Sequence, residues 1–222
     1  MEKEKRIKHY SSKHKILLVG EGDFSFSLCL AKAFGSASNM VATSLDSKGT
    51  LGIYYSRALD NLLQLEDLGC TILHGVDAHA MSQHAFLKDK LFDQIVFNFP
   101  HAGFLFSELS SRGIELHRDL VRGFMRSSRE MVSEDGEIHV THKTTHPFSE
   151  WKMEEIAKEV GLFLVNEVPF YKWDYDGYCN KKGSGSKCNK TFNVGECSTF
   201  RFMKKKDPPI TSQVNNERNE YF

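Results

Sequence analysis

The sequence predicts a single α/β domain in which a mostly parallel sheet is covered by helices and ends in an antiparallel hairpin. Two observations carry this prediction. Short apolar runs of strand character alternate with longer stretches of helical period between residues 14 and 203, as in a parallel sheet with crossover helices. The last two apolar runs have no helical period between them, so they should pair antiparallel. A length of 222 residues suits one core better than two.

The predicted strands are the short apolar runs. They cover Ile16–Val19, Met40–Leu45, Cys70–Leu73, Phe92–Phe97 and Ile138–Thr141, and the hairpin is formed by Leu162–Phe170 and Thr199–Met203. Helices are predicted at Phe26–Phe34, Ile53–Leu68, Ala80–Lys88, Glu115–Val132 and Ser149–Val160. The apolar residues of the longest helix keep a helical spacing, so its arginines, Arg118 and Arg122 among them, are expected to be solvated charges on the outer face.

The two ends of the chain differ from this core. Residues 1–13 are basic and have almost no apolar periodicity, which predicts a mobile arm. Residues 204–222 begin with three lysines and are expected to form a flexible polar tail. The folded domain is therefore expected over residues 14–203.

Composition and charge narrow the class of protein. Lysine and arginine total 29, and aspartate and glutamate also total 29, so no global positive field attracts nucleic acid and any RNA contact must be local. Five cysteines without a secretory leader indicate a reduced, intracellular protein. No apolar run reaches the roughly 18 residues of a membrane helix, so no membrane partner is expected.

The segment Gly20-Glu21-Gly22-Asp23-Phe24-Ser25 lies where the first strand must turn into a helix. Glycines there allow the backbone to pass close beneath a ligand, and the free amides of a helix start favour electron-rich groups. Glu21 and Asp23 would repel a pyrophosphate but suit a cationic sulfonium and an ammonium group. The segment is therefore predicted to bind S-adenosylmethionine rather than NAD, with a plain tight turn as the alternative.

Two more carboxylates follow the next strands. Asp46 comes at the end of the second strand, where an acid can accept hydrogen bonds from both ribose hydroxyls, and a loop cap is the alternative. Asp77 follows the third strand, where it could receive the adenine amino group while Val76 packs on the ring. A helix N-cap explains Asp77 equally well.

The fourth strand runs into Asn98-Phe99-Pro100-His101, which is similar to the asparagine-aromatic-proline signature of methyltransferases that act on planar nitrogens in bases. In that signature the proline fixes the backbone, the amide holds the target edge, and an aromatic ring stacks on a base taken out of its stack. Here Phe99 precedes Pro100 and His101 follows it, so the division of roles is open. His101 is a candidate general base or hydrogen-bond donor, and a partly buried polar group is the alternative.

Histidines and cysteines do not predict a metal site. On a strand, His139 and His142 would point to opposite faces. Cys179, Cys188 and Cys197 are separated by eight intervening residues each, whereas a zinc knuckle has about two to four. We expect no metal.

Three separated motifs resemble the family of 25S ribosomal RNA uridine-N3 methyltransferases and their plant relatives. They are residues 15–27, 92–101 and 195–200, they occur in the right order, and the resemblance covers roughly residues 14 to 203. It implies a three-layer, Rossmann-like class I methyltransferase fold that uses S-adenosylmethionine to methylate N3 of a uridine in large-subunit rRNA, usually in the nucleolus. It also implies that Asn98 to His101 face the target, with His101 or a water held by Asn98 assisting loss of the N3 proton.

The segment 171–193 mixes aromatic and basic residues around a Gly183-Ser184-Gly185-Ser186 centre, a composition suited to stacking bases and meeting phosphates, or to a solvated hairpin loop. Two other functions stay open. A catalytically weak relative could bind the cofactor or RNA as an interaction module. A methyltransferase for a small molecule or a protein would be favoured if this segment packed shut over a small pocket.

Overall fold

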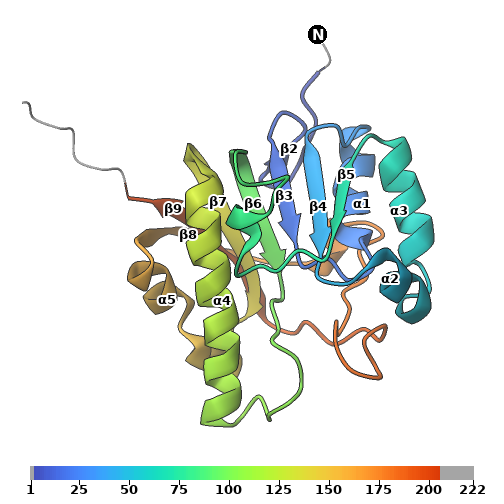
Figure 1. The fold of residues 1–222 in the computed structure, drawn as a ribbon. Helices are drawn as coiled ribbons and strands as arrows, with labels where there is room; N and C mark the ends of the chain where they lie inside the picture. Colours follow the sequence, from blue (N-terminus) through green and yellow to red (C-terminus); the bar gives the residue numbers. More distant parts are fainter. Residues whose placement is uncertain (1–2, 206–222) are drawn as a thin grey trace, which may run out of the picture.

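The computed structural model describes residues 3–205, which form a seven-stranded sheet between two layers of helices (Figure 1). The strand order is β5-β4-β3-β6-β7-β9-β8. Parallel pairing joins β3 (Ile16–Val19), β4 (Met40–Ser44), β5 (Thr71–His74), β6 (Phe92–Asn98) and β7 (Val132–Lys143). β9 (Cys197–Lys204) runs antiparallel to both β7 and β8 (Leu162–Pro169). The predicted α/β fold and its terminal hairpin are confirmed.

The helices cover both faces of this sheet. One face carries α1 (Ser25–Phe34), α2 (Lys48–Tyr54) and α3 (Ala58–Asp67), and the other carries α4 (Ser111–Met131) and α5 (Met153–Glu159). The alternation of β3 explains the two cores, because Ile16 and Leu18 pack in the first and Leu17 and Val19 in the second. No helix within residues 3–205 is long and apolar enough to cross a membrane.

Three of the predicted helices have the wrong bounds. The stretch predicted as one helix from Ile53 to Leu68 is divided between α2 and α3, because Tyr55 adopts an extended backbone and buries its ring. Ala80–Lys88 forms only the single turn η1 (Met81–Gln83), where the Ser82 N–H donates to Ser127 Oγ of α4 instead of continuing a helix. In Ser149–Val160, Lys152 at φ 51° separates η2 (Phe148–Trp151) from α5.

Residues 3–13, within the stretch expected to form a mobile arm, contain a hairpin that packs on the core. β1 (Arg6–Ile7) and β2 (Tyr10–Ser11) form a hairpin. Tyr10 is 1% exposed and packs against Phe26 and Tyr175. Burial of this one aromatic ring outweighs the basic character of the segment. The predicted tail lies outside the described residues from position 206 onward, and Lys204 ends β9.

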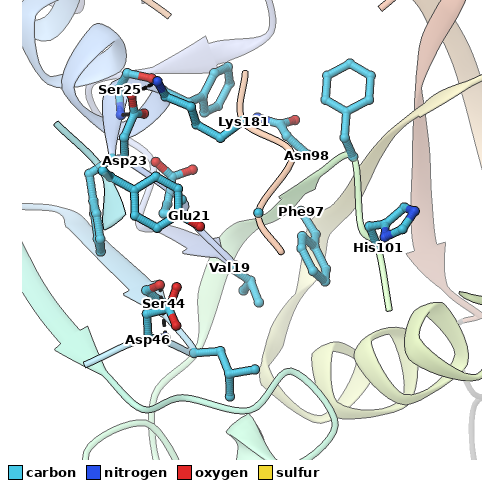
Figure 2. Close-up of a pocket in the computed structure, with 18 of the residues that line it drawn as sticks. Val19, Glu21, Asp23, Ser25, Ser44, Asp46, Phe97, Asn98, His101 and Lys181 are labelled. Atoms are coloured by element: carbon cyan, nitrogen blue, oxygen red, sulfur yellow. Dashed lines mark hydrogen bonds and ion pairs between the residues drawn. The ribbon is translucent and has the colours of Figure 1, made fainter. Parts of the chain in front are cut away.

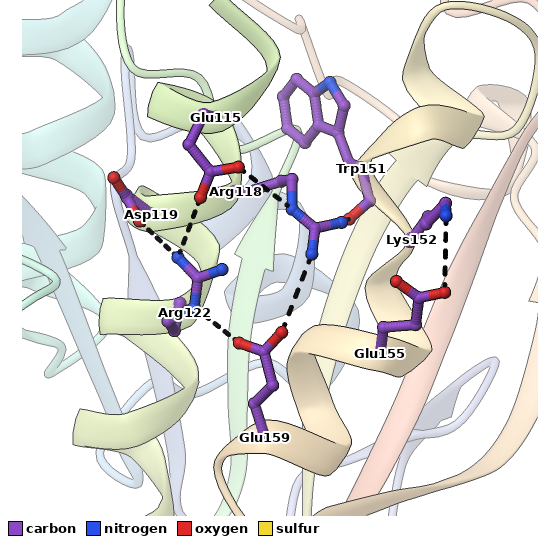
Figure 3. A network of polar contacts seen from close by, with 8 residues as sticks. All are labelled: Glu115, Arg118, Asp119, Arg122, Trp151, Lys152, Glu155 and Glu159. Atoms are coloured by element: carbon purple, nitrogen blue, oxygen red, sulfur yellow. Dashed lines mark hydrogen bonds and ion pairs between the residues drawn. The ribbon is translucent and has the colours of Figure 1, made fainter. Parts of the chain in front are cut away.

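Arg118 and Arg122 of α4 are ion-paired, not solvated as expected (Figure 3). The Arg118 guanidinium donates to the carbonyl of Trp151 at 2.7 Å, and Arg122 donates to Glu159 of α5 at 2.7 Å. Their side chains are only 14% and 20% exposed. These contacts fix η2 and α5, and with them the Trp151 ring, against α4.

Candidate cofactor and substrate site

A cavity lies where the carboxyl ends of β3, β4 and β6 meet the loops that follow them (Figure 2). β3 is the point where the strand order reverses, since the chain first moves outward to β4 and β5 and then returns to β6 on the other side. Open parallel sheets bind ligands at this point. Of the predicted site residues, this first cavity is lined by Gly20 to Ser25, Asp46, Asp77, Asn98, Phe99 and His101, and Pro100 lines a second cavity beside it.

The turn after β3 needs glycine at Gly20 and leaves little room at Gly22. Gly20 has a φ of +67°, and a Cβ there would lie 2.3 Å from Cε2 of Phe97. A Cβ on Gly22 would lie 3.3 Å from Cβ of Lys181, so Lys181 would have to shift by a few tenths of an ångström. The absence of a side chain at Gly20 therefore lets the backbone approach β6.

Glu21 and Asp23 are both buried but have different partners. Glu21 accepts hydrogen bonds from the backbone N–H and the hydroxyl of Ser27, at 3.2 and 2.8 Å, and burial raises its pKa to about 7. Asp23 accepts the Ser25 N–H through Oδ1 at 3.1 Å, and its Oδ2 lies 3.5 Å from Nζ of Lys181. The Asp23 carboxylate, and Glu21 where it is ionised, make this end of the cavity favourable for cationic groups.

Asp46 and Asp77 lie at the ends of the neighbouring strands. Burial raises the pKa of Asp46, and no side chain within residues 3–205 donates to its carboxylate. Asp77 accepts the His79 N–H at 2.9 Å, so it caps the turn before η1 and also lines the cavity. For Asp77 the cap and the cofactor contact are therefore compatible.

Asn98 stands at the end of β6 on the side opposite the carboxylates (Figure 2). Both its amide oxygen and its amide nitrogen are buried, and neither has a hydrogen-bond partner among the described residues. A buried amide left unpaired costs about 1–3 kcal/mol, and this one lines the cavity, where a ligand can supply its partners. Next to it, Phe99 has a left-handed φ of 50°, which redirects the chain out of the strand.

Residues 178–183 of the segment 171–193 line the cavity. The composition of this segment suggested contacts of its basic residues with phosphates, yet the Lys181 side chain is 9% exposed and lies beside Asp23, with Nζ donating to Oδ1 of Asn189 at 2.8 Å. Ser25 Oγ accepts the Cys179 N–H at 2.9 Å and anchors the segment to α1. No local pattern signals the contact of Ser25 with Cys179, since it joins residues 154 positions apart.

The second cavity adjoins the first and is aromatic. Phe99, His101, Lys181 and Lys182 line both cavities. The remaining lining residues are Pro100, Phe104, Glu108, His142, Lys143, Phe148, Trp151 and Phe192. Rings pack behind its wall, with centroids of His101 and His117 4.2 Å apart in a tilted arrangement and those of His117 and Trp151 4.5 Å apart in a stacked one. A planar group can therefore lie against rings within reach of the first cavity.

The first cavity fits S-adenosylmethionine. Its glycine turn leaves the space that side chains would fill, its carboxylates match the cationic sulfonium, and Asp46 is available at the position of a ribose ligand. Within residues 3–205 no three His, Cys, Asp or Glu side chains are grouped to hold a metal ion.

Comparisons with known proteins agree with this geometry. Residues 17–182 match the family model described as rRNA (uridine-N3-)-methyltransferase BTM5-like. Uncharacterized protein At4g26485 of Arabidopsis thaliana is 56% identical over 202 residues, which cover 90% of this chain and 97% of that protein. The 25S rRNA (uridine(2634)-N(3))-methyltransferase of Saccharomyces cerevisiae is 23% identical over 231 residues, which cover 80% of this chain and 68% of that protein. A TehB-like SAM-dependent methyltransferase from Corynebacterium glutamicum has the same fold, with a TM-score of 0.50, 22% identity, and coverage of 86% of this chain and 80% of the other.

Proposed function

The chain belongs to the rRNA (uridine-N3-)-methyltransferase BTM5-like family, and on that premise we propose that it methylates N3 of a uridine in large-subunit rRNA. Family and fold make it a methyltransferase, and S-adenosylmethionine is its methyl donor. The target nitrogen, the RNA that carries it and a nucleolar location are the proposed part, supported by the yeast relative.

The observation that carries this proposal is the unpaired Asn98 amide on the wall of the first cavity. A uracil edge presents an N–H between two carbonyl groups. The Asn98 Nδ2 can donate to one of these carbonyl groups, which leaves the N–H between them free of Asn98. One side chain can thus fix the edge of the base that must face the methyl donor.

We assign the residues of the first cavity to the methyl donor. When bound, S-adenosylmethionine supplies an electrophilic methyl group on a positively charged sulfur. Gly20 and Gly22 let the backbone approach it, Glu21 and Asp23 complement its positive charge, and Asp46 accepts hydrogen bonds from its ribose. Phe24 and Ser25 shape the start of α1, and Asp77 is assigned to the adenine end.

The second cavity suits a base taken out of its stack. Phe99 and Phe148 offer ring surfaces for stacking, and Pro100 fixes the backbone beside Phe99. Lys143 lies with Nζ 4.7 Å from the Phe148 ring centroid and can meet a flanking phosphate. Local cations of this kind are the RNA contacts that a chain without net charge requires.

The proposal is tested with Asn98→Ala and large-subunit rRNA that lacks the modification. Transfer, measured as N3-methyluridine by mass spectrometry, should fall about 100-fold, as for loss of one donor that faces the reacting group. Cofactor affinity should stay within about twofold. The free energy of unfolding should be unchanged or higher by about 1 kcal/mol, because two unpaired buried atoms are removed.

Asn166→Ala is the matched control, since Asn166 is exposed on β8 and should change neither transfer nor stability. A wild-type protein that binds S-adenosylmethionine and methylates no rRNA would refute the uridine proposal. Gly22→Val should abolish cofactor binding, and normal binding by that variant would refute the assignment of the first cavity.

A second candidate is a methyltransferase for a compact substrate that is not RNA. The packing of residues 171–193 over the first cavity favours it, through the contacts of Ser25 with Cys179 and of Lys181 with Asn189. Transfer of labelled methyl groups to a nucleic-acid-free extract, with none to rRNA, would select this candidate. Cofactor binding without transfer to either would indicate an interaction module.

A further inference from the structure

Both ring nitrogens of His101 are already engaged. Nδ1 accepts the Gly103 N–H at 3.1 Å and therefore carries no proton, because a backbone N–H can only donate. Nε2 lies 3.0 Å from Oε1 of Glu108, so the proton of the neutral ring is on Nε2 and is donated to that carboxylate. Burial also lowers the pKa of His101, which keeps the ring neutral. No lone pair remains on His101 to take a proton from a substrate.

Glu108 is the one acidic side chain among the described residues that line the second cavity. It is 36% exposed, and within residues 3–205 its hydrogen-bond and ion-pair partner is His101, through Oε1. Its second oxygen can therefore accept a proton from a group in the cavity and release it to water.

His142 is the competing base in the same cavity, and the structure makes it a poor one. Its Nε2 lies 3.2 Å from the carbonyl oxygen of Phe148, so Nε2 carries the proton. The side chain is buried against Trp151, and burial lowers its pKa to about 3. The other basic groups that line the cavity are Lys143, Lys181 and Lys182, which as ammonium groups can only donate.

We propose that the Glu108 carboxylate accepts the proton of the nitrogen that is methylated, and that His101 is a positioning residue that orients Glu108. The inference rests on the proposed function. In the step, the bond from nitrogen to the methyl carbon forms, and the bond from that carbon to sulfur breaks with its electron pair going to sulfur. The N–H bond breaks with its proton going to Oε2 of Glu108, and from there to water.

Several titratable and charged groups surround Glu108. They are His101 beside it, His117 of α4, His142 and Lys143 of β7, and Lys181 and Lys182 of the covering segment. Burial lowers the pKa of His117 to about 4, so the three histidines are neutral at pH 7 and the lysines provide the positive charge. The positive charge of these lysines thus lies on the cavity wall that Glu108 shares.

The test compares Glu108→Gln, His101→Gln and the exposed control Glu134→Gln across a pH series with unmodified rRNA. Glu108→Gln keeps an acceptor for the His101 N–H, yet kcat should fall about 100-fold near pH 7. The defect should shrink as the pH rises, because the imide nitrogen then loses its proton without assistance. The kcat of His101→Gln should fall about tenfold, and the kcat of Glu134→Gln should equal that of the wild type.

A greater loss in His101→Gln than in Glu108→Gln, or a Glu108→Gln defect that is the same at every pH, would overturn the proposal. The ring-nitrogen NMR spectrum of ¹⁵N-labelled His101 gives a readout that does not need turnover. A proton on Nε2 is expected, and a proton on Nδ1 would overturn the proposal. A wild-type protein that does not methylate rRNA while showing the Nε2 proton would instead locate the failure in the proposed function.

Discussion

The first cavity has two walls that are built in different ways. The glycine wall, residues 19–25, is one continuous stretch whose shape follows from the positive φ of Gly20 and the small size of Gly22. The covering wall, residues 178–183, is placed by tertiary contacts such as the bonds of Cys179 to Ser25, 154 positions away. Backbone conformation fixes the first wall, whereas side-chain pairing fixes the second.

Gly20→Ala breaks the glycine wall and has the largest expected effect. Its Cβ would overlap the Phe97 ring at 2.3 Å, and the backbone would keep a left-handed φ of +67°. Strain and overpacking together should lower the free energy of unfolding by about 4 kcal/mol in urea titrations. Gly195→Ala separates the two causes, because Gly195 has a φ of +58° with no atom within 4 Å of an added Cβ. The free energy of unfolding of Gly195→Ala should fall by about 1 kcal/mol. An equal fall in Gly20→Ala and Gly195→Ala would show that the contact with Phe97 is unimportant.

Glu21 tests the glycine wall separately from the covering wall, because its buried carboxyl group lies within residues 19–25. Burial raises its pKa from 4.5 to about 7. Between these values the unfolded chain binds fewer protons than the folded one, so stability falls as the pH rises through this window. The penalty should reach about 3 kcal/mol above pH 7. Glu21→Gln should therefore be more stable than the wild type at pH 8 and about equal at pH 4, measured by urea unfolding, whereas a pH-independent difference would contradict the assignment.

The fold could be predicted from the sequence wherever local pattern and tertiary structure agree. The apolar run Ile16 to Val19 forms the central strand because its residues alternate between two cores. Prediction failed where one side chain decides the outcome. Tyr55 interrupts a helical period to bury its ring, and Tyr10 holds a basic segment on the core. Neither effect can be derived from periodicity or charge, since both depend on the pocket that receives the ring.

In the candidate site, too, some residues could be predicted from local sequence and others could not. Residues directly after strands, such as Gly20, Asp46 and Asn98, could be proposed because parallel strands end at one edge. Lys181 and Glu108 could not be placed, since each lies in an irregular segment whose path is set by distant partners, Asn189 and His101 among them. His101 was a candidate base by position, and only the geometry shows that both its nitrogens are engaged.

Ser25→Ala breaks the bond between the two walls and has the smallest expected effect. The Ser25 hydroxyl accepts the Cys179 N–H at 2.9 Å and donates to the Cys179 carbonyl at 3.3 Å. Its loss should lower the free energy of unfolding by about 1 kcal/mol. Hydrogen exchange at the Cys179 amide should become faster, while exchange in β3 changes less, because a wall fixed by side-chain pairing can open locally. Ser186→Ala, in the same segment but exposed, is the control and should leave exchange unchanged. Equal acceleration in β3 would show that the two walls unfold as one unit and that their different construction has no energetic consequence.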